Sequence, residues 1–273
     1  MKIEYLRTNH MTNPEGFALT PLTFSWITTE ADGDRTNRIR VQIAKSSDFS
    51  TVQFDSGWLD YSGINYYYPP ICVENRKKYF WKIWVEDNLG NQAVSDYAWF
   101  RTEPGAILGE WICSQSCDEK YEAHHSNVIF FKEVTIEKKP IESACLYVSA
   151  FGVYEASLNG KKLGSEFLAP FYNDYSNWLQ IQTYDLKKCV KIGINTLEFL
   201  MGEGWYMGRF GYVDKLDCLY GNRQAIICEL EIIYEDGNVQ RIVSDSSFYC
   251  KKSPVVSSSI YDGEVFDARL LND

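Results

Sequence analysis

The chain has 273 residues, enough for two domains with cores of their own, and 15% of them are aromatic, a composition that favours strands. Its formal net charge is −10, and the sequence has no basic stripe that could neutralise the phosphates of a nucleic acid. The negative charge also disfavours an anionic membrane, but it is compatible with a neutral ligand such as a sugar. We expect a cytoplasmic protein without a membrane span, because residues 1–7 form no apolar signal segment and no apolar run reaches about 20 residues. The eight cysteines are therefore expected as reduced thiols, several of them packed in apolar strands.

Residues 1–103 are predicted to form a fibronectin type III-like or immunoglobulin-like sandwich of short strands. Apolar and polar residues alternate in 38–43 and again in 79–86, the pattern of strands with one buried face. No long helical pattern and no convergent catalytic groups occur here, so we interpret the region as a spacer or packing domain. Three of its tryptophans are assigned to the core: Trp26, Trp58 and Trp81.

The rest of the chain is predicted to be a second sandwich and its borders. Residues 104–112 are expected to form a linker, because Pro104-Gly105 stops the preceding strand. Residues 113–258 show the strand pattern of an antiparallel jelly roll, or galactose-binding-like sandwich. Residues 259–273 are interpreted as the start of a following domain that is truncated at the end of the sequence.

Local patterns place the strands of this second sandwich. Residues 144–150 are almost continuously apolar, as in a strand buried on both faces, whereas Glu229 and Glu231 alternate with apolar neighbours, as in a half-buried strand. Asn159-Gly160 between alternating flanks predicts a two-residue hairpin, because both turn positions require positive φ. Helix is expected only as one or two turns at 186–191. Further strands are expected at 128–136, 196–201 and 239–243.

Two loops combine aromatic rings with amides and carboxylates, which are the groups that contact the face and the hydroxyls of a sugar. The first loop contains Tyr172-Asn173-Asp174-Tyr175, and the second contains Trp205-Tyr206 between glycines. Five segments occur in an order that resembles the N-terminal β-sandwich module of bacterial α-L-rhamnosidases: GVYEASLNGKKLG, LAPFYNDY, QTYDL, GWYMGRFGY and IYDGEVFDAR. Residues 1–103 are similar to the fibronectin-type module that precedes this one in the same family, so the resemblance spans essentially the whole chain.

These enzymes are inverting glycoside hydrolases that cleave terminal rhamnose. The resemblance places their catalytic carboxylates in a helical (α/α)6 barrel, to which the similarity does not extend. It therefore implies an accessory region that supports the barrel and binds terminal L-rhamnose. Two alternatives stay open: the chain is part of an active hydrolase when complete, or it is a structural fragment that docks on the barrel without affinity for sugar.

The candidate sugar contacts follow from the two loops and from the resemblance. They are Tyr172, Asn173, Asp174, Tyr175, Trp205 and Tyr206. In some rhamnosidases the corresponding module binds L-rhamnose together with a calcium ion, and the resemblance implies Asp174, with Asn173 beside it, as the metal ligands. No cofactor is required under this interpretation. The alternative is that Asp174 caps a turn and that the tyrosines pack against the edge of the sandwich.

Other chemistry finds no support in the sequence. Asp262 and Glu264 would share one face of a strand, and Glu203 lies in the second loop, but nothing around them indicates the general acid that glycoside hydrolysis needs. Neither a Gly-x-Ser-x-Gly elbow nor a dinucleotide-binding fingerprint occurs. We therefore predict no catalytic residue. A zinc site is disfavoured because its ligands are not separated into paired halves; they would be Cys113, Cys117, His124 and His125.

Overall fold

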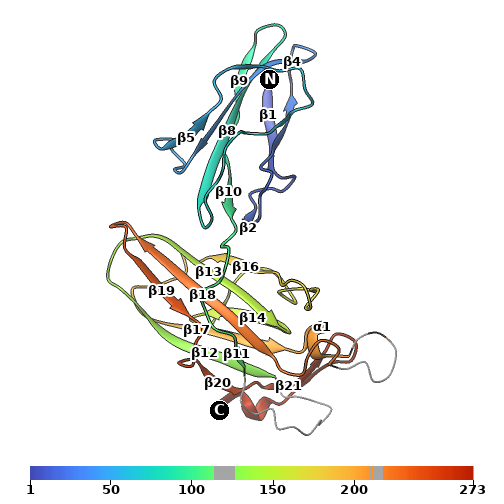
Figure 1. Ribbon diagram of the computed structural model, residues 1–273, viewed down its shortest axis with the longest axis vertical. Helices are drawn as coiled ribbons and strands as arrows, with labels where there is room; N and C mark the ends of the chain where they lie inside the picture. The colour runs from blue at the N-terminus through green and yellow to red at the C-terminus, as the bar shows by residue number, and fades with distance from the viewer. Residues whose placement is uncertain (114–126, 210, 212–217, 273) are drawn as a thin grey trace. The chain divides into compact units, whose positions relative to one another are not determined.

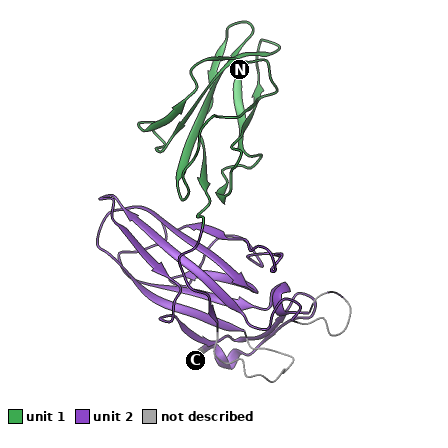
Figure 2. Cartoon of the chain, viewed as in Figure 1, with its two compact units in different colours: residues 1–105 green, residues 106–273 purple. Residues whose placement is uncertain are grey.

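The computed structural model describes residues 1–113, 127–209, 211 and 218–272. Strands dominate it, and the described helices are α1 (Gly204–Met207) and the 3-10 helix Ala268–Asn272, both too short to cross a membrane. The chain divides into two compact units, residues 1–105 and 106–273, each with its own hydrophobic core (Figure 2). The all-β prediction is thus confirmed.

Unit 1 is a sandwich of two sheets, as predicted for an immunoglobulin-like domain (Figure 1). The smaller sheet has the strand order β1-β3-β7, and the larger has the order β2-β10-β8-β4-β5, with β6 paired to β4 and β9 to β8. The strands are β1 (Lys2–Thr8), β2 (Glu15–Phe17), β3 (Phe24–Thr29), β4 (Thr36–Ala44), β5 (Val52–Asp55), β6 (Leu59–Asp60), β7 (Tyr66–Tyr67), β8 (Lys78–Asp87), β9 (Gln92–Val94) and β10 (Ala98–Thr102).

The core of unit 1 is centred on Trp81, one of the alternating inward side chains of β8. Its side chain is fully buried, and its ring stacks on Phe24 of β3 with 4.1 Å between the ring centroids. The indole N–H donates to the buried hydroxyl of Thr8 at 3.0 Å, so the one polar atom of this side chain is satisfied. The two sheets are therefore joined by an aromatic contact and a hydrogen bond.

One of the three tryptophans assigned to the core does not lie there. Trp26 and Trp81 are buried as predicted, but Trp58 is only half-buried. It lies between the end of β5 and the start of β6, at the edge of the sheet, where its ring packs against the Arg38 guanidinium at 5.5 Å. A tryptophan at a sheet edge contacts a neighbouring side chain rather than the opposite sheet.

Unit 2 is a second sandwich whose sheets are antiparallel throughout (Figure 1). One sheet has the order β11-β18-β13-β16 with β19 on β18, the other has the order β15-β14-β17-β12-β20, and a separate hairpin joins β21 to β22. The strands are β11 (Ile112–Cys113), β12 (Val128–Ile136), β13 (Ile141–Phe151), β14 (Val153–Leu158), β15 (Lys161–Lys162), β16 (Gln182–Asp185), β17 (Gly193–Gly202), β18 (Ala225–Tyr234), β19 (Val239–Val243), β20 (Tyr249–Lys252), β21 (Val255–Ser259) and β22 (Gly263–Phe266).

Several local predictions for this unit are confirmed. Residues 144–150 are all buried within β13, so both faces of that strand are covered. Asn159 and Gly160 have φ of 53° and 72° and connect β14 to β15 as the predicted hairpin. Cys145 and Cys228 are buried in β13 and β18, as expected for cysteines packed in apolar strands.

The prediction of a half-buried β18 is wrong, because Glu229 and Glu231 are exposed to only 0% and 4%. The segment 106–113, which includes much of the predicted linker, lies against this strand. The amide of Leu108 donates to Glu229 Oε2 at 2.9 Å, and β11 pairs with β18. Arg241 on β19 neutralises both carboxylates, at 3.2 Å from Glu229 and 2.6 Å from Glu231.

The one or two helical turns expected at 186–191 are reduced to a single hydrogen-bonded turn. Residues 187–189 form only a turn, in which the amides of Cys189 and Val190 donate to the carbonyl of Leu186. The short α-helix occurs instead at Gly204–Met207, where the second aromatic loop leaves β17. Gly204 has a φ of 56°, and a Cβ there would lie 2.6 Å from the Val153 side chain, so glycine permits the tight start of this helix.

Candidate functional site

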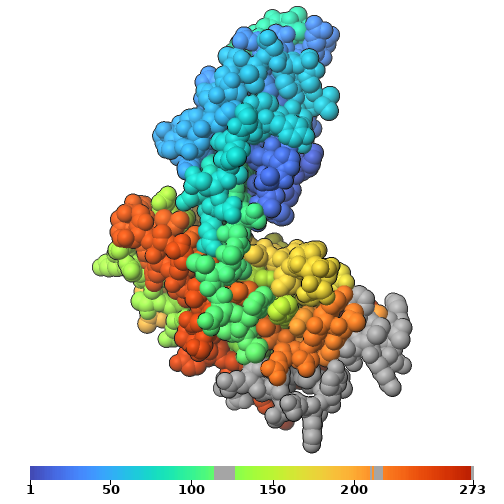
Figure 3. Space-filling model, in the orientation of Figure 1, coloured from blue at the N-terminus to red at the C-terminus, as the bar shows by residue number. Residues whose placement is uncertain are grey.

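The predicted sugar contacts meet at one end of unit 2, in a cluster of aromatic side chains. The first loop lies between β15 and β16, and the second follows β17 and includes α1. Figure 3 shows residues of the first loop, in yellow, on the surface next to the orange segment that contains α1. The cluster consists of Trp111, Phe151, Tyr172, Tyr175, Trp205, Tyr206 and Tyr220.

Tyr172 is the most exposed tyrosine of this cluster, with 45% of its surface open. Its ring lies at a steep angle to those of Trp205 and Tyr175, with centroids 6.2 Å and 6.4 Å away. Its hydroxyl lies 2.7 Å from that of Tyr220. The rings therefore form a corner with aromatic faces in different directions and with hydroxyl groups at its edge.

Asn173, in contrast, lies inside the loop and holds it together. It is fully buried, and its side-chain N–H groups donate to the carbonyls of Pro170 and Phe171 at 3.2 Å and 3.0 Å. Its side-chain oxygen accepts from the amide of Gln180 at 2.8 Å. Both donors and one lone pair of the amide are thus used to close the loop.

Asp174 combines a turn with an accessible carboxylate. Its main-chain carbonyl accepts from the amides of Asn177 and Trp178 at 2.8 Å and 2.9 Å. Carboxylate oxygen Oδ2 accepts from the Asn177 side chain at 2.7 Å, whereas Oδ1 has no hydrogen-bond partner in the described part of the chain. Asp174 thus organises the turn and still presents one acceptor.

The lower part of the cluster is a stack of rings that supports this corner. Trp111 stacks on Phe151 at 4.4 Å, Phe151 on Tyr206 at 4.8 Å, and Tyr175 meets Tyr206 edge-on at 5.1 Å. Burial raises the pKa of Tyr175 to about 12 and also raises the pKa of Tyr206. Both phenols are neutral near pH 7. The lower part of the cluster therefore provides packing and no group that could accept a proton as a general base.

Three members of the cluster were not among the predicted site residues: Trp111, Phe151 and Tyr220. Each comes from a different segment of the chain, so proximity in the sequence does not reveal them. One signal exists for Tyr220, because Gly221 follows it. A Cβ on Gly221 would lie 2.0 Å from the Tyr206 hydroxyl, which shows that glycine here allows the two segments to approach closely.

The acidic residues considered for catalysis lie at three different places in the fold of unit 2. Asp262 lies in the β21–β22 turn rather than in a strand and is held by Arg209 at 2.7 Å and 3.0 Å. Glu264 lies on β22, and Glu203 immediately precedes α1. Among the described residues no three His, Cys, Asp or Glu side chains gather as a metal site. Cys117, His124 and His125 lie outside the described residues.

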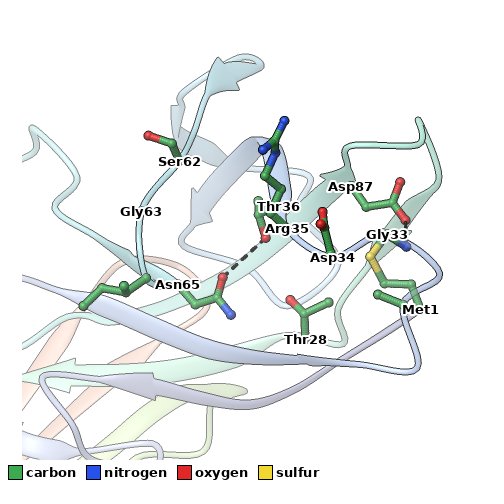
Figure 4. Close-up of a pocket in the computed structure, with 12 residues that line it drawn as sticks. Met1, Thr28, Gly33, Asp34, Arg35, Thr36, Ser62, Gly63, Asn65 and Asp87 are labelled. Carbon is green, nitrogen blue, oxygen red and sulfur yellow. Dashed lines mark hydrogen bonds between the residues drawn. The ribbon is translucent and has the colours of Figure 1, made fainter.

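Unit 1 contains a separate cavity of about 510 Å³ (Figure 4). On its wall the Thr36 hydroxyl donates a hydrogen bond to the side-chain oxygen of Asn65 at 3.5 Å. Asp87 accepts hydrogen bonds from the amides of Gly33 and Asn91, and hydrogen bonds lower the pKa of its carboxyl group. Asp87 is therefore an organiser of loops, not a proton donor.

Comparison with known proteins relates both units to one group of enzymes. Residues 139–273 match the family profile described as the α-L-rhamnosidase N-terminal domain, and residues 3–105 match that of the Rha78A-like N-terminal immunoglobulin domain. An α-L-rhamnosidase of Formosa agariphila is 26% identical over 281 aligned positions, covering 94% of this chain and 29% of the relative. One of Streptomyces avermitilis is 39% identical over 137 positions, covering 50% of this chain and 13% of the relative.

Solved structures agree with this relationship. The α-L-rhamnosidase of Aspergillus terreus superposes with a TM-score of 0.87 at 26% identity, over 98% of this chain and 31% of that one. The Streptomyces avermitilis α-L-rhamnosidase complexed with L-rhamnose has the same fold in this region, with a TM-score of 0.88 at 20% identity, over 98% of this chain and 43% of that one. The chain thus spans less than half the length of these proteins.

Proposed function

The chain belongs to the α-L-rhamnosidase family, to whose N-terminal region it corresponds, and on this premise we propose that it serves such an enzyme as an accessory region that binds sugar. The aromatic corner formed by Tyr172, Trp205 and Tyr220 is the proposed site. Hydrolytic activity is not part of this proposal, which concerns the N-terminal region of such an enzyme.

One observation carries this proposal: an exposed aromatic corner lies next to an available carboxylate oxygen. A pyranose ring presents C–H groups on its faces and hydroxyls around its rim. The exposed part of Tyr172 can stack on such a face, and Asp174 Oδ1 can accept from a hydroxyl. Asn173 contributes by holding both residues in the loop, and so it positions the site without contacting the sugar.

Terminal L-rhamnose is the proposed ligand. It is a neutral 6-deoxy sugar whose methyl group suits an aromatic corner, and the Streptomyces avermitilis relative was solved in complex with it. Calcium is not a requirement of the proposal. Asn173 already uses its amide within the loop, so Asp174 would be the available ligand of the predicted pair, and calcium prefers several oxygen ligands.

The test is a calorimetric titration of the whole chain with L-rhamnose, in calcium and again in EDTA. We expect binding in both buffers, weakened at least about tenfold, or about 1.4 kcal/mol, by Tyr172→Ala and by Asp174→Ala. Tyr97→Ala removes a tyrosine of unit 1 that is 52% exposed, against 45% for Tyr172, and should change nothing. No heat in either buffer from a folded protein would refute the proposal, and binding that is lost in EDTA would establish a calcium site.

A second candidate function is docking on the catalytic barrel. It is supported by the apolar side chains that the C-terminal hairpin exposes, since Val265 and Phe266 are 58% and 51% open. Val265→Ser together with Phe266→Ser should then weaken binding to a separately produced barrel of a relative, with rhamnose binding unchanged. Hydrolysis of an aryl α-L-rhamnoside by this chain alone would contradict both proposals.

A further inference from the structure

We propose that unit 2 has a second carbohydrate site, a groove on the outer face of the sheet β15-β14-β17-β12-β20 that takes a short neutral oligosaccharide. The groove has a volume of about 550 Å³ and lies over β12, β17 and the segment that leads into β20. This volume is within the usual range of ligand sites, about 300–1,000 Å³. None of its lining residues belongs to the aromatic cluster described above.

The register of the strands builds this groove. Phe131 on β12 pairs with Glu198 on β17 and, on its other side, with Tyr249 on β20. Glu133 pairs with Thr196 one step further along. These side chains lie on the outer face because their neighbours in each strand, such as Phe130 and Phe199, fill the core. The sheet therefore places aromatic and polar groups next to one another on one surface.

The floor of the groove is an aromatic platform. The rings of Phe131 and Tyr249 are stacked, with centroids 5.5 Å apart and an angle of 25° between their planes. Tyr249 is 67% exposed in spite of this contact. Because the rings stack, each covers part of the other's face, and the exposed remainder of Tyr249 is the platform for the face of a sugar ring.

The polar groups around this platform suit hydroxyls rather than charges. Glu133 and Glu198 provide carboxylate acceptors and Thr196 a hydroxyl, whereas the ammonium group of Lys132 forms an ion pair with Asp245 at 3.4 Å. The two carboxylates disfavour a polyanion and do not repel a neutral chain. One oxygen of Glu198 accepts weakly from Ser157 at 3.4 Å, which orients the carboxylate toward the sheet surface.

The proposal is tested by titrating the whole chain with cellotetraose, xylotetraose and tetragalacturonic acid and comparing variants. We expect at least one neutral tetrasaccharide to bind, and to bind more tightly than the acidic one. Tyr249→Ala should weaken this binding at least tenfold, and Glu198→Gln, which keeps one acceptor oxygen, several-fold. Tyr249→Phe should retain most of it, because the ring remains. Far-UV circular dichroism and thermal unfolding establish that each variant is folded.

Two controls separate this groove from the aromatic cluster. Tyr172→Ala should leave tetrasaccharide binding unchanged, and Tyr249→Ala should leave L-rhamnose binding unchanged. The groove is refuted if neither neutral tetrasaccharide binds the folded chain, if Tyr249→Ala binds as well as the original, or if Tyr172→Ala abolishes the binding of both ligands. The last result would mean that one site at the aromatic cluster serves both.

Discussion

Aromatic side chains are used in opposite ways in the two units. In unit 1, Trp81 and Phe24 stack between the sheets and are both fully buried. In unit 2, Tyr172 and Trp205 contact each other at the end of the sandwich, and 45% of Tyr172 is open to solvent. A stacked ring pair therefore stabilises a core in one place, and an edge-to-face pair leaves a surface for a ligand in the other.

The difference shows that aromatic content alone does not indicate a binding site. What distinguishes the cluster in unit 2 is the loop around Asn173, which is closed by side chain-to-backbone hydrogen bonds and therefore can hold large rings at the surface. In unit 1 the regular alternation of β8 directs the rings inward. The following variants test this contrast, from the largest expected effect to the smallest.

Trp81→Ala should cost the most. A buried tryptophan truncated to alanine typically loses about 3–5 kcal/mol, and here the buried Thr8 hydroxyl also loses its donor. We expect this loss in unit 1, measured by urea unfolding and by hydrogen exchange of its strands, while exchange in unit 2 is unchanged. Trp99→Ala, on the half-buried face of β10 next to Lys78, should cost less than about 1 kcal/mol. Equal losses for the two variants would contradict the contrast.

Asn173→Ala should have an intermediate effect. It removes a buried amide and leaves the carbonyls of Pro170 and Phe171 and the amide of Gln180 without this partner, so we expect a loss of about 1–3 kcal/mol. Faster hydrogen exchange of the Gln180 amide would locate the change. The adjacent Asp174→Ala should cost less than about 1 kcal/mol, because its half-exposed side chain accepts a hydrogen bond only from Asn177 in the described part of the chain. An equally large loss at Asp174 would show that the two neighbours have the same structural role.

Tyr175 gives the smallest effect, and it depends on pH. Its pKa is about 12 because burial disfavours the phenolate, compared with about 10 in an unfolded chain. The contribution of the neutral, buried phenol to the free energy of unfolding is therefore present below pH about 10 and is lost as the pH rises toward 12. NMR with tyrosine labelled at Cζ should show this residue titrating near 12, with Tyr175→Phe identifying the signal. A midpoint near 10 would mean that the base of the cluster is open to water.

The local features of the fold could be predicted from the sequence. The strand expected at 128–136 has those bounds as β12, and Asn159-Gly160 turns as expected, because alternation and turn chemistry depend on neighbouring residues only. The burial of Glu229 could not be predicted in this way. Its cover comes from Leu108, which is 121 positions earlier in the chain.

The candidate site could be predicted only in part, because some of its contacts join residues that are far apart in the sequence. The first loop and the second loop do meet, through Tyr172 and Trp205. Asn173 looks like a ligand residue in the sequence, and only its contact with Gln180 shows that it closes the loop. Tyr220 is absent from the predicted site because its hydrogen bond to Tyr172 joins residues 48 positions apart.

The segment that crosses β18 decides where unit 2 can be separated from unit 1. Residues 106–113 supply an edge strand, a hydrogen bond to Glu229, and the Glu110 carbonyl that accepts from Ser244 at 2.7 Å. A fragment that starts after this segment would remove the cover from the Glu229 carboxylate and leave backbone groups of β18 unpaired at the edge of a sheet, which favours aggregation. An independently produced unit 2 should therefore begin near Ala106, so that it keeps the segment that covers Glu229 and pairs with β18.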